Sequence, residues 1–327
     1  MSKKGISIII CCFNSVSRLP KTLEYLARQT VCKDIPVELL LVNNASTDRT
    51  KEVALEEWNQ YHNDFLFRMV DEDKQGHMFA RIKGFQESQY EYVLFCDDDN
   101  WLQSDYLQKA LDLMESNARI GALGGQSVAI SDIDFPEWFP DFEDGYAVGK
   151  QSNSSGDVSN RGFLWGAGMI VRRFLLDKIF DNKYPMLIEG RTGSKLISGD
   201  DSEICKRILL LGYTLHYDSS LLFYHYIAPN RLTWAYKKRL YEGFDISWEI
   251  LRKYDFVHNE IKKNMLNKMK GIMFSVLKML FKSGNSKKRL KTVLLVRAGV
   301  ILQNAKISND LGYKNILSFA FDNKSKQ

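Results

Sequence analysis

The sequence lacks a long apolar run, a cysteine framework and a secretion signal, and each absence narrows the class of protein. No stretch of roughly 18 consecutive apolar residues occurs, so no membrane-spanning helix is expected. The N-terminus leads directly into a strand-like segment, without the apolar stretch and small-residue cleavage site of a signal peptide. The five cysteines are scattered and form no CxxC pair, which favours a reducing compartment. We therefore expect a cytoplasmic protein.

The charge is small overall but unevenly distributed. The formal net charge is +5, yet residues 1–250 carry 28 Lys and Arg against 36 Asp and Glu, whereas residues 251–327 carry 17 against 4. An acidic body is thus followed by a basic tail. No nucleic-acid-binding motif, internal repeat or low-complexity tract accompanies this tail, so nucleic acid is not expected as a partner.

Short apolar segments alternate with amphipathic helical patterns through the first 120 residues. Such an alternation predicts an α/β fold, a doubly wound sheet with right-handed crossovers. The predicted strands are Ile6–Phe13, Val37–Val42, Phe65–Val70 and Tyr90–Cys96. Because ligands bind at the carboxyl ends of the strands in such sheets, four loops become candidates for a site. These loops are Cys12–Ser17, Asn43–Thr47, Asp71–His77 and Asp97–Trp101.

The second half of the chain has a less regular pattern. Residues 121–172 are rich in glycine and aromatic side chains and are expected to be irregular, apart from a strand over Gly166–Val171. A further strand is expected over Thr214–Tyr226, and the chain beyond Pro229 is expected to be helical.

Three successive carboxylates, Asp97 to Asp99, directly follow a buried strand. Like charges at this spacing repel one another unless a cation or hydrogen-bond donors neutralise them. Mg²⁺ takes oxygen ligands, typically one or two carboxylates together with substrate phosphates. The alternative is a solvated acidic turn, since Asp side chains favour turns. The position after a buried strand favours a metal site.

The motifs and their order resemble those of family 2 glycosyltransferases with a GT-A fold. The resemblance covers about residues 5–240 and implies a Rossmann-type nucleotide-binding sheet. It rests on five segments in family order. They are Phe13-Asn14 after the first strand, Val42–Asp48, the Gly76 to Gly84 segment with Ala80-Arg81, Asp97–Asp99, and Gly199–Glu203.

This resemblance implies a role for each member of the triplet. Asp97–Asp99 match the family's DXD motif, in which Asp99 would bind the metal that holds the donor diphosphate, with Asp97 secondary. Asp98 would face the ribose or the nucleotide. Asn44 stands where many members have an aspartate that bonds the uracil edge. An amide offers both a donor and an acceptor, which leaves uracil, another pyrimidine or guanine open as the base. Further donor contacts are implied at Phe13, Asn14 and Arg81, although Arg81 could instead form a surface ion pair.

The second acidic segment would supply the general base. Asp201 aligns with the family's catalytic aspartate, while Asp200 or Ser202 could cap the helix that begins there. His225 matches a histidine near the diphosphate or metal, although a lone histidine among aromatics can simply be packed in place. Acceptor contacts are implied at Trp165, Gly166, Glu203 and Trp138.

The expected activity is therefore that of a metal-dependent, inverting hexosyltransferase. It would move a sugar from a nucleotide-diphosphate donor, with UDP-sugar favoured, to a saccharide, glycolipid or glycoprotein acceptor in surface glycan or polysaccharide biosynthesis. Mg²⁺ or Mn²⁺ is the expected cofactor. A sugar nucleotidyltransferase is one alternative, but its glycine-rich first loop is missing from Cys11–Ser15. A non-catalytic nucleotide-sugar-binding scaffold is the other.

The predicted domains are a catalytic domain over 1–240 and a basic amphipathic helical tail over 241–327. Within the first, residues 1–120 would form the nucleotide-sugar-binding half and 121–240 the acceptor half. Residues 261–303 mix basic and apolar side chains, which favours binding at an anionic membrane surface, so the protein could be peripheral at the inner face of the cell membrane. The alternatives are packing on the catalytic domain or on a second copy, which would make a homo-oligomer.

Overall fold

The computed structural model describes residues 3–192, 196–281 and 310–324, with the backbone alone over 264–281. It divides into two compact units, Met1–Leu251 and Arg252–Gln327. The boundary lies inside the long helix α7 (Trp234–Phe281), so the predicted boundary at residue 240 falls within a continuous helix.

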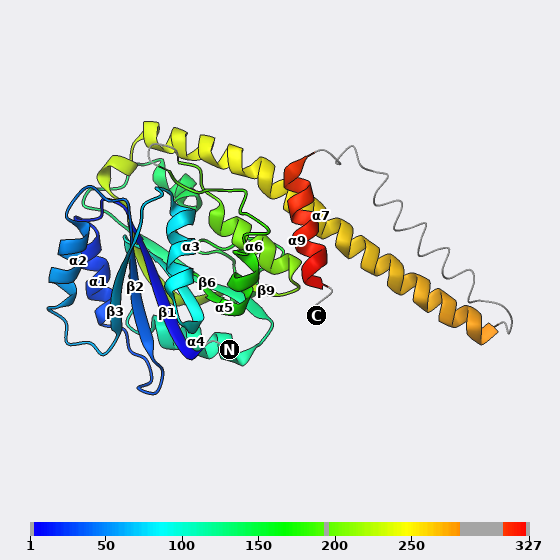
Figure 1. Ribbon diagram of the computed structural model, residues 1–327. Coiled ribbons are helices and arrows are strands. Elements are labelled where there is room, and N and C mark those ends of the chain that lie inside the picture. The colour runs from blue at the N-terminus through cyan, green and yellow to red at the C-terminus, as the bar shows by residue number, and fades with distance from the viewer. Residues whose placement is uncertain (1–2, 193–195, 282–309, 325–327) are drawn as a thin grey trace. The chain divides into compact units, whose positions relative to one another are not determined.

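A central mixed sheet of nine described strands organises the first unit (Figure 1), in the order β3-β2-β1-β4-β8-β6-β9-β5 with β7 paired to β9. The predicted α/β fold with a nucleotide-binding-type sheet is confirmed, and helices follow it as expected. The strands before residue 100 are β1 (Lys3–Cys12), β2 (Val37–Asn44), β3 (Leu66–Glu72) and β4 (Tyr90–Asp97). The later strands are β5 (Asn100–Leu102), β6 (Ile120–Ile130), β7 (Gly156–Asp157), β8 (Ile170–Arg172) and β9 (Thr214–Tyr226).

The first four strands are parallel, with β1 between β2 and β4, so their carboxyl ends meet at one edge. Strands β5 and β9 pair antiparallel, and this register sets Asn100 opposite His225. The end of β9 is thereby brought to the loop that follows β4.

Helices cover both faces of the sheet, as Figure 1 shows for α1 and α2 on one side of the strands and α3 on the other. Alternate β1 residues such as Ile6, Ile8 and Ile10 pack in one core with Leu23 and Leu107 from the first helical layer. The helices are α1 (Leu19–Ala27), α2 (Thr50–Trp58), α3 (His77–Glu87), α4 (Tyr106–Ser116), α5 (Arg173–Ile179), α6 (Asp200–Leu210) and α9 (Leu311–Lys324).

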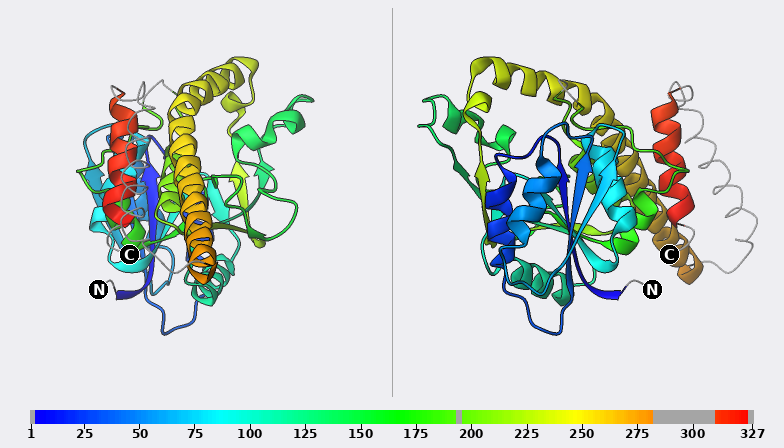
Figure 2. Two further views of the ribbon diagram at one scale, coloured as in Figure 1. Left: turned by 90° about the vertical axis from the view of Figure 1, so that its right-hand side faces the viewer. Right: turned by 60° about the vertical axis from the view of Figure 1, so that its left-hand side comes forward.

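A smaller hydrophobic cluster joins the 3-10 helix η1 (Phe139–Tyr146) to the chain after β9. It contains Phe139, Tyr146, Leu232 and Leu240, among others. Figure 2 shows η1 beside the first turns of α7 in both views, in agreement with the 5.1 Å between the Trp138 and Trp234 ring centroids. This cluster fixes the short 3-10 helix η2 (Pro229–Arg231) next to the carboxyl edge of the sheet.

Two predictions for the second half are wrong. The segment expected to be irregular contains the eleven-residue strand β6, whose glycines permit close packing: a Cβ on Gly125 would lie 2.0 Å from the carbonyl oxygen of Leu221. The predicted strand over Gly166–Val171 shrinks to Ile170–Arg172. Gly168 has a left-handed φ of +70°, which interrupts an extended strand before Ile170.

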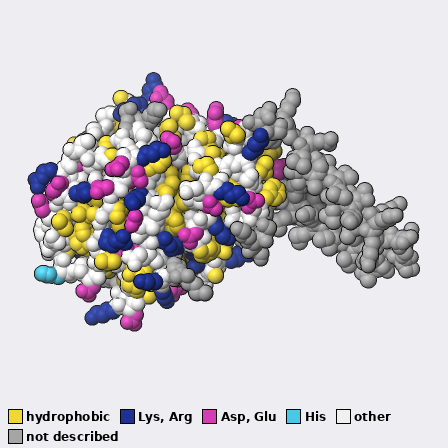
Figure 3. Space-filling model, viewed as in Figure 1, with side chains coloured by type: hydrophobic (Ala, Val, Ile, Leu, Met, Phe, Trp, Pro, Cys, Tyr) yellow, Lys and Arg dark blue, Asp and Glu magenta, His cyan; other side chains and the backbone are white. Residues whose placement is uncertain are grey.

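Among the described residues, no helix has both the length and the apolar character needed to cross a membrane. On the face of the molecule that Figure 3 displays, acidic and basic side chains are interspersed over the first unit. Of the tail segment 261–303, residues 261–281 belong to α7, and the rest lies outside the described residues.

Candidate active site

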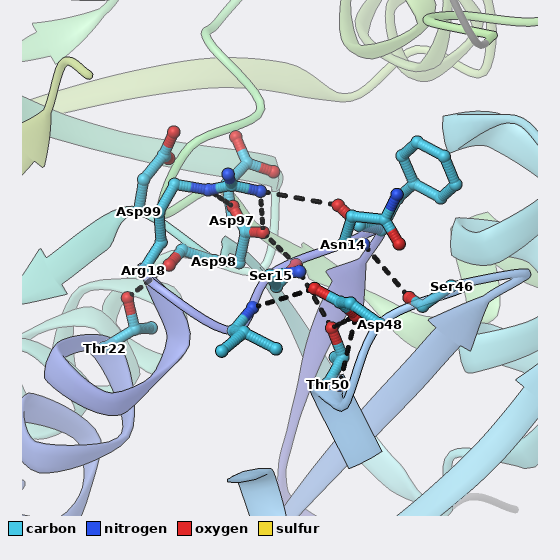
Figure 4. Close-up of polar contacts among 12 residues, drawn as sticks. Asn14, Ser15, Arg18, Thr22, Ser46, Asp48, Thr50, Asp97, Asp98 and Asp99 are labelled. Atoms are coloured by element: carbon cyan, nitrogen blue, oxygen red, sulfur yellow. Dashed lines mark hydrogen bonds and ion pairs between the residues drawn. The ribbon is translucent and has the colours of Figure 1, made fainter. Parts of the chain in front are cut away.

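The acidic triplet lies at the carboxyl edge of the sheet, between the end of β4 and the start of β5. Figure 4 shows the carboxyl groups of Asp97 and Asp99 on one side of this loop and that of Asp98 turned toward Ser15 and Arg18. Asp98 and Asp99 are 8% and 7% exposed, so their charges are largely removed from water. Each carboxylate of the triplet has its own cationic partner in the protein.

Asp98 is bound by the loop that follows β1. Arg18 donates from Nη2 to Oδ2 at 2.6 Å and from Nε to Oδ1 at 3.2 Å, and the Ser15 hydroxyl donates to Oδ2 as well. Burial raises the pKa of the Asp98 carboxyl despite the opposing effect of Arg18. Because both oxygens already have partners, any contact of Asp98 with a nucleotide would have to share them.

Asp99 is paired from the other side, by residues at and after the end of β9. Arg231 donates from Nη1 to Oδ2 at 2.9 Å, and Nε2 of His225 lies 3.4 Å from Oδ1. Burial alone would raise the pKa of Asp99, but His225 and Arg231 outweigh this effect and hold the pKa below its usual range. Asp99 is therefore ionised at neutral pH. The structure brings the predicted pair Asp99 and His225 together.

Asp97 connects to the second acidic segment through His77. The imidazole lies with Nε2 3.5 Å from Asp97 and Nδ1 3.0 Å from Asp200, which also pairs with Arg81 at 2.9 Å. Burial and Arg81 would lower the pKa of His77, but the two carboxylates outweigh them and raise it. Asp200 has a lowered pKa because Arg81 and His77 overcome the effect of its burial. A chain of partly and fully buried polar side chains thus links the two acidic motifs.

Asp201 lies at the start of α6, beside this chain of polar side chains but with different partners. Its Oδ2 accepts a hydrogen bond from the Gly166 amide at 2.7 Å, and its Oδ1 accepts one from the Ser202 amide at 2.6 Å. Burial and the negative charge of Asp200 raise the pKa of Asp201. Neither Asp200 nor Ser202 caps the helix, because Gly199 occupies the N-cap position without a side-chain cap.

The order of these acidic motifs agrees with a known protein family. Residues 7–180, just over half of the chain, match the model of glycosyl transferase family 2. This chain is a family 2 glycosyltransferase. The assignment supports a transferase rather than a nucleotidyltransferase, and it fits the order of acidic motifs along the chain.

Curated relatives and solved structures agree with this family 2 assignment. The chain is 25% identical over 226 residues to the glycosyltransferase AglE of Haloferax volcanii, covering 68% of this chain and 67% of that protein. It is 28% identical over 111 residues to the putative glycosyltransferase EpsH of Bacillus subtilis, covering 34% of this chain but only 30% of EpsH.

The crystal structure of S. aureus TarS is similar with a TM-score of 0.51 at 18% identity, covering 69% of this chain and 37% of that one. The structure of TarS 1-349 in complex with UDP-GlcNAc also has a TM-score of 0.51, at 19% identity, covering 68% of this chain and 58% of that one. These similarities show a shared GT-A fold. The chain spans only 30% of the length of EpsH and 37% of that of full TarS.

Two predicted site residues of this family 2 enzyme are held in structural contacts. Asn44 is 4% exposed, donates to the carbonyl oxygens of Glu72 and Lys74, and accepts from the Gly76 amide. Its amide protons are thus used to hold the loop after β3 rather than left for a base. Glu203 is fully buried and so cannot contact an acceptor at the surface. Its carboxylate accepts hydrogen bonds from Arg207 and from the backbone amides of Leu187 and Ile188.

The remaining predicted residues differ in their exposure to solvent and in their contacts. Trp165 is 6% exposed, with the Arg161 guanidinium 5.1 Å from its ring centre, and its acceptor role stays a prediction. Trp138 is half-buried in the aromatic group around η1, and its acceptor role stays a prediction. Phe13 is 39% exposed. The side-chain oxygen of Asn14 accepts a hydrogen bond from the Thr47 amide, which joins the loop after β1 to the loop after β2.

Sequence reasoning missed three cations of the site: Arg18, His77 and Arg231. Each lies in or just after a loop at the carboxyl edge of the sheet. That position was the available signal, because buried carboxylates require counter-charges. Arg81 was identified, but it is a fully buried partner of Asp200 rather than a surface ion pair. A Cβ at Gly166 would lie 2.2 Å from its guanidinium, which explains the glycine.

Proposed function

We propose that this family 2 glycosyltransferase transfers a sugar from a UDP-sugar to a hydroxyl group of a saccharide, lipid-linked or protein-linked acceptor, with inversion at the anomeric carbon. The observation that carries the proposal is a contrast between two carboxylates. The pKa of Asp99 is held low by cations, whereas that of Asp201 is raised by burial and by Asp200. Environments that push two pKa values apart commonly separate a charge-stabilising role from an acid–base role.

The donor site suits a cation that is shared with a diphosphate. Two possible metal-ligating atoms, Oδ1 of Asp99 and Nε2 of His225, lie 3.4 Å apart. No group of three His, Cys, Asp or Glu among the described residues could hold a metal ion alone. Mg²⁺ is usually bound through one or two carboxylates and substrate phosphates. Asp99 and His225 would hold the cation, with Asp97 secondary, and it would supply charge neutralisation for the diphosphate. Family 2 enzymes commonly use divalent cations.

Asp201 would act as the general base. The acceptor oxygen would form a bond to the anomeric carbon as the bond from that carbon to the diphosphate breaks, and the acceptor proton would pass to the Asp201 carboxylate. A carboxylate oxygen that accepts one amide hydrogen bond keeps a second lone pair for this proton. The raised pKa makes the Asp201 carboxylate a stronger base than an exposed aspartate. A single displacement of this kind, with one base, inverts the configuration at the anomeric carbon.

The donor assignment can be tested by isothermal titration with UDP, GDP and dTDP, each with and without Mn²⁺. Binding of one nucleotide that depends on Mn²⁺ and is lost in Asp99→Ala is the expected result. Absence of binding to any nucleotide would overturn the proposal. The stereochemistry is tested separately by NMR of the product, where an anomer matching the donor's configuration would contradict a single displacement.

We further propose that the enzyme works in polysaccharide or surface glycan assembly, at the inner face of the cell membrane. Five unpaired cysteines suit a reducing compartment, and the charge excess of residues 251–327 suits anionic lipids. Flotation of the full chain with vesicles of anionic or neutral phospholipid tests the membrane contact. Equal recovery with both vesicles, or with neither, would contradict it, and light scattering in the same buffer would detect a homo-oligomer.

A further inference from the structure

Arg231 enters the acidic loop from the segment that follows β9. It is the last residue of η2, and its carbonyl oxygen accepts a hydrogen bond from the Tyr146 hydroxyl at 3.0 Å. The next residue, Leu232, is buried in the cluster that joins η1 to α7. The guanidinium pairs with Asp99 at 2.9 Å and lies 5.6 Å from the centre of the Tyr236 ring. The backbone of Arg231 is therefore firmly held, while its side chain ends at the predicted metal ligand.

Two polar atoms beside this pair have no hydrogen-bond partner among the described residues. They are Nε of Arg231 and Nδ1 of His225, both buried. The side chain of Arg231 is only 12% exposed, so water cannot freely serve its Nε group. A buried N–H group without a hydrogen-bond acceptor costs free energy, and a ligand with several acceptor oxygens would recover it. The unsatisfied donor lies next to the carboxylate expected to bind the donor's cation.

A guanidinium and a divalent cation cannot fully use the same carboxylate together. With a cation on Asp99, the charge of Arg231 would lose its counter-ion, and a buried unpaired charge is unfavourable. The planar guanidinium matches phosphate oxygens with paired hydrogen bonds. A bound diphosphate would therefore supply the partner that the cation removes.

We propose that Arg231 is an exchangeable counter-ion of the donor site. In the nucleotide-free protein it neutralises Asp99. When the cation and the nucleoside diphosphate bind, it leaves Asp99 and pairs with the diphosphate oxygens. The inference rests on the proposed donor site. Its consequence is that cation and nucleotide bind weakly alone and strongly together, which is a positive coupling between two ligands.

The test uses the full chain and measures binding by titration calorimetry, with Mn²⁺ alone and with UDP in the presence of Mn²⁺. Arg231→Gln removes the competing charge and is expected to bind Mn²⁺ alone about tenfold more tightly. The same variant is expected to bind UDP with Mn²⁺ about tenfold more weakly, which corresponds to about 1.4 kcal/mol, because one charge-assisted contact is lost. Arg231→Lys, which keeps the charge, should recover part of the UDP affinity.

Arg28→Gln is the matched control, since the Arg28 side chain is 63% exposed and pairs with Glu24 on α1. It should bind both ligands as the unchanged protein does. Unchanged affinities in Arg231→Gln, or weaker binding of Mn²⁺ alone in a variant with an unaltered thermal melt, would overturn the exchange. If Arg231→Gln melts early, Arg231→Lys decides the matter through its UDP affinity. Failure of the unchanged protein to bind UDP would overturn the proposed function instead, while the Mn²⁺ measurements would still show whether Arg231 competes for Asp99.

Discussion

Replacing Glu203 with alanine separates a structural role from an acceptor-binding one. The Glu203 carboxylate accepts from the Leu187 amide at 3.0 Å and the Ile188 amide at 2.8 Å. It also pairs with Arg207 at 3.0 Å, where the two side chains are 0% and 1% exposed. Removing one partner of a buried ion pair costs about 3–5 kcal/mol, because the other charge stays buried. The free energy of unfolding should fall by this amount in Glu203→Ala.

Urea denaturation followed by tryptophan fluorescence measures the loss. Glu56→Ala is the control, because that side chain is 63% exposed on α2 and pairs with the equally open Arg49. Its unfolding free energy should change by less than about 0.5 kcal/mol. Glu203→Gln keeps the shape of the side chain and should fall between the two. A stability loss under about 1 kcal/mol in Glu203→Ala, joined to a higher KM for the acceptor, would refute the structural assignment.

Three further predictions concern the paired charges. Gly166→Ala would place a Cβ 2.2 Å from Arg81, so we expect a stability loss of about 1–3 kcal/mol and reduced activity, measured by thermal melting and product formation. Asp201→Asn should lower kcat by roughly 10²–10⁴ while UDP affinity is unchanged, and a parallel loss of UDP affinity would contradict its assignment as base. His77 has a pKa raised above 6.5, so its contribution to stability is complete below pH 6.5 and is lost as the pH rises through the raised value. The unchanged protein should therefore lose more stability than His77→Gln between pH 6 and pH 9 in urea titrations, and equal losses would contradict this linkage.

The first half of the fold could be predicted because β1, β2 and β4 are largely buried on both faces and therefore read as continuous apolar runs. The second half could not, and β6 shows why. Its glycines, which usually weaken a strand, are required where Tyr106 and Leu221 approach the backbone closely. Such close approaches depend on distant parts of the chain and leave no periodic pattern in the sequence.

The acidic residues of the site could be found from sequence, but their partners could not. The triplet was conspicuous because it follows a buried strand, whereas Arg18 and Arg231 are separated from it by 80 and 132 positions. Glu203 is a different case, in which a signal was available. Two residues along a helix rotate the side chain by about 200°, so Asp201 and Glu203 point to opposite faces. Arg207, four residues further on, indicated the ion pair.

Each triplet carboxylate pairs with a different segment of the chain, and this affects whether the site can be transferred to another protein. Asp97, Asp98 and Asp99 are neutralised from α3, from the loop before α1 and from the segment after β9, respectively. The partners of Asp97 and Asp98 lie within the first 120 residues, whereas Arg231 is 132 positions from Asp99. The contact of Asp99 therefore forms only after distant parts of the chain have come together. Grafted onto another protein without residues 225–231, the first 120 residues would present Asp99 with neither His225 nor Arg231, and this buried carboxylate would lack its partners.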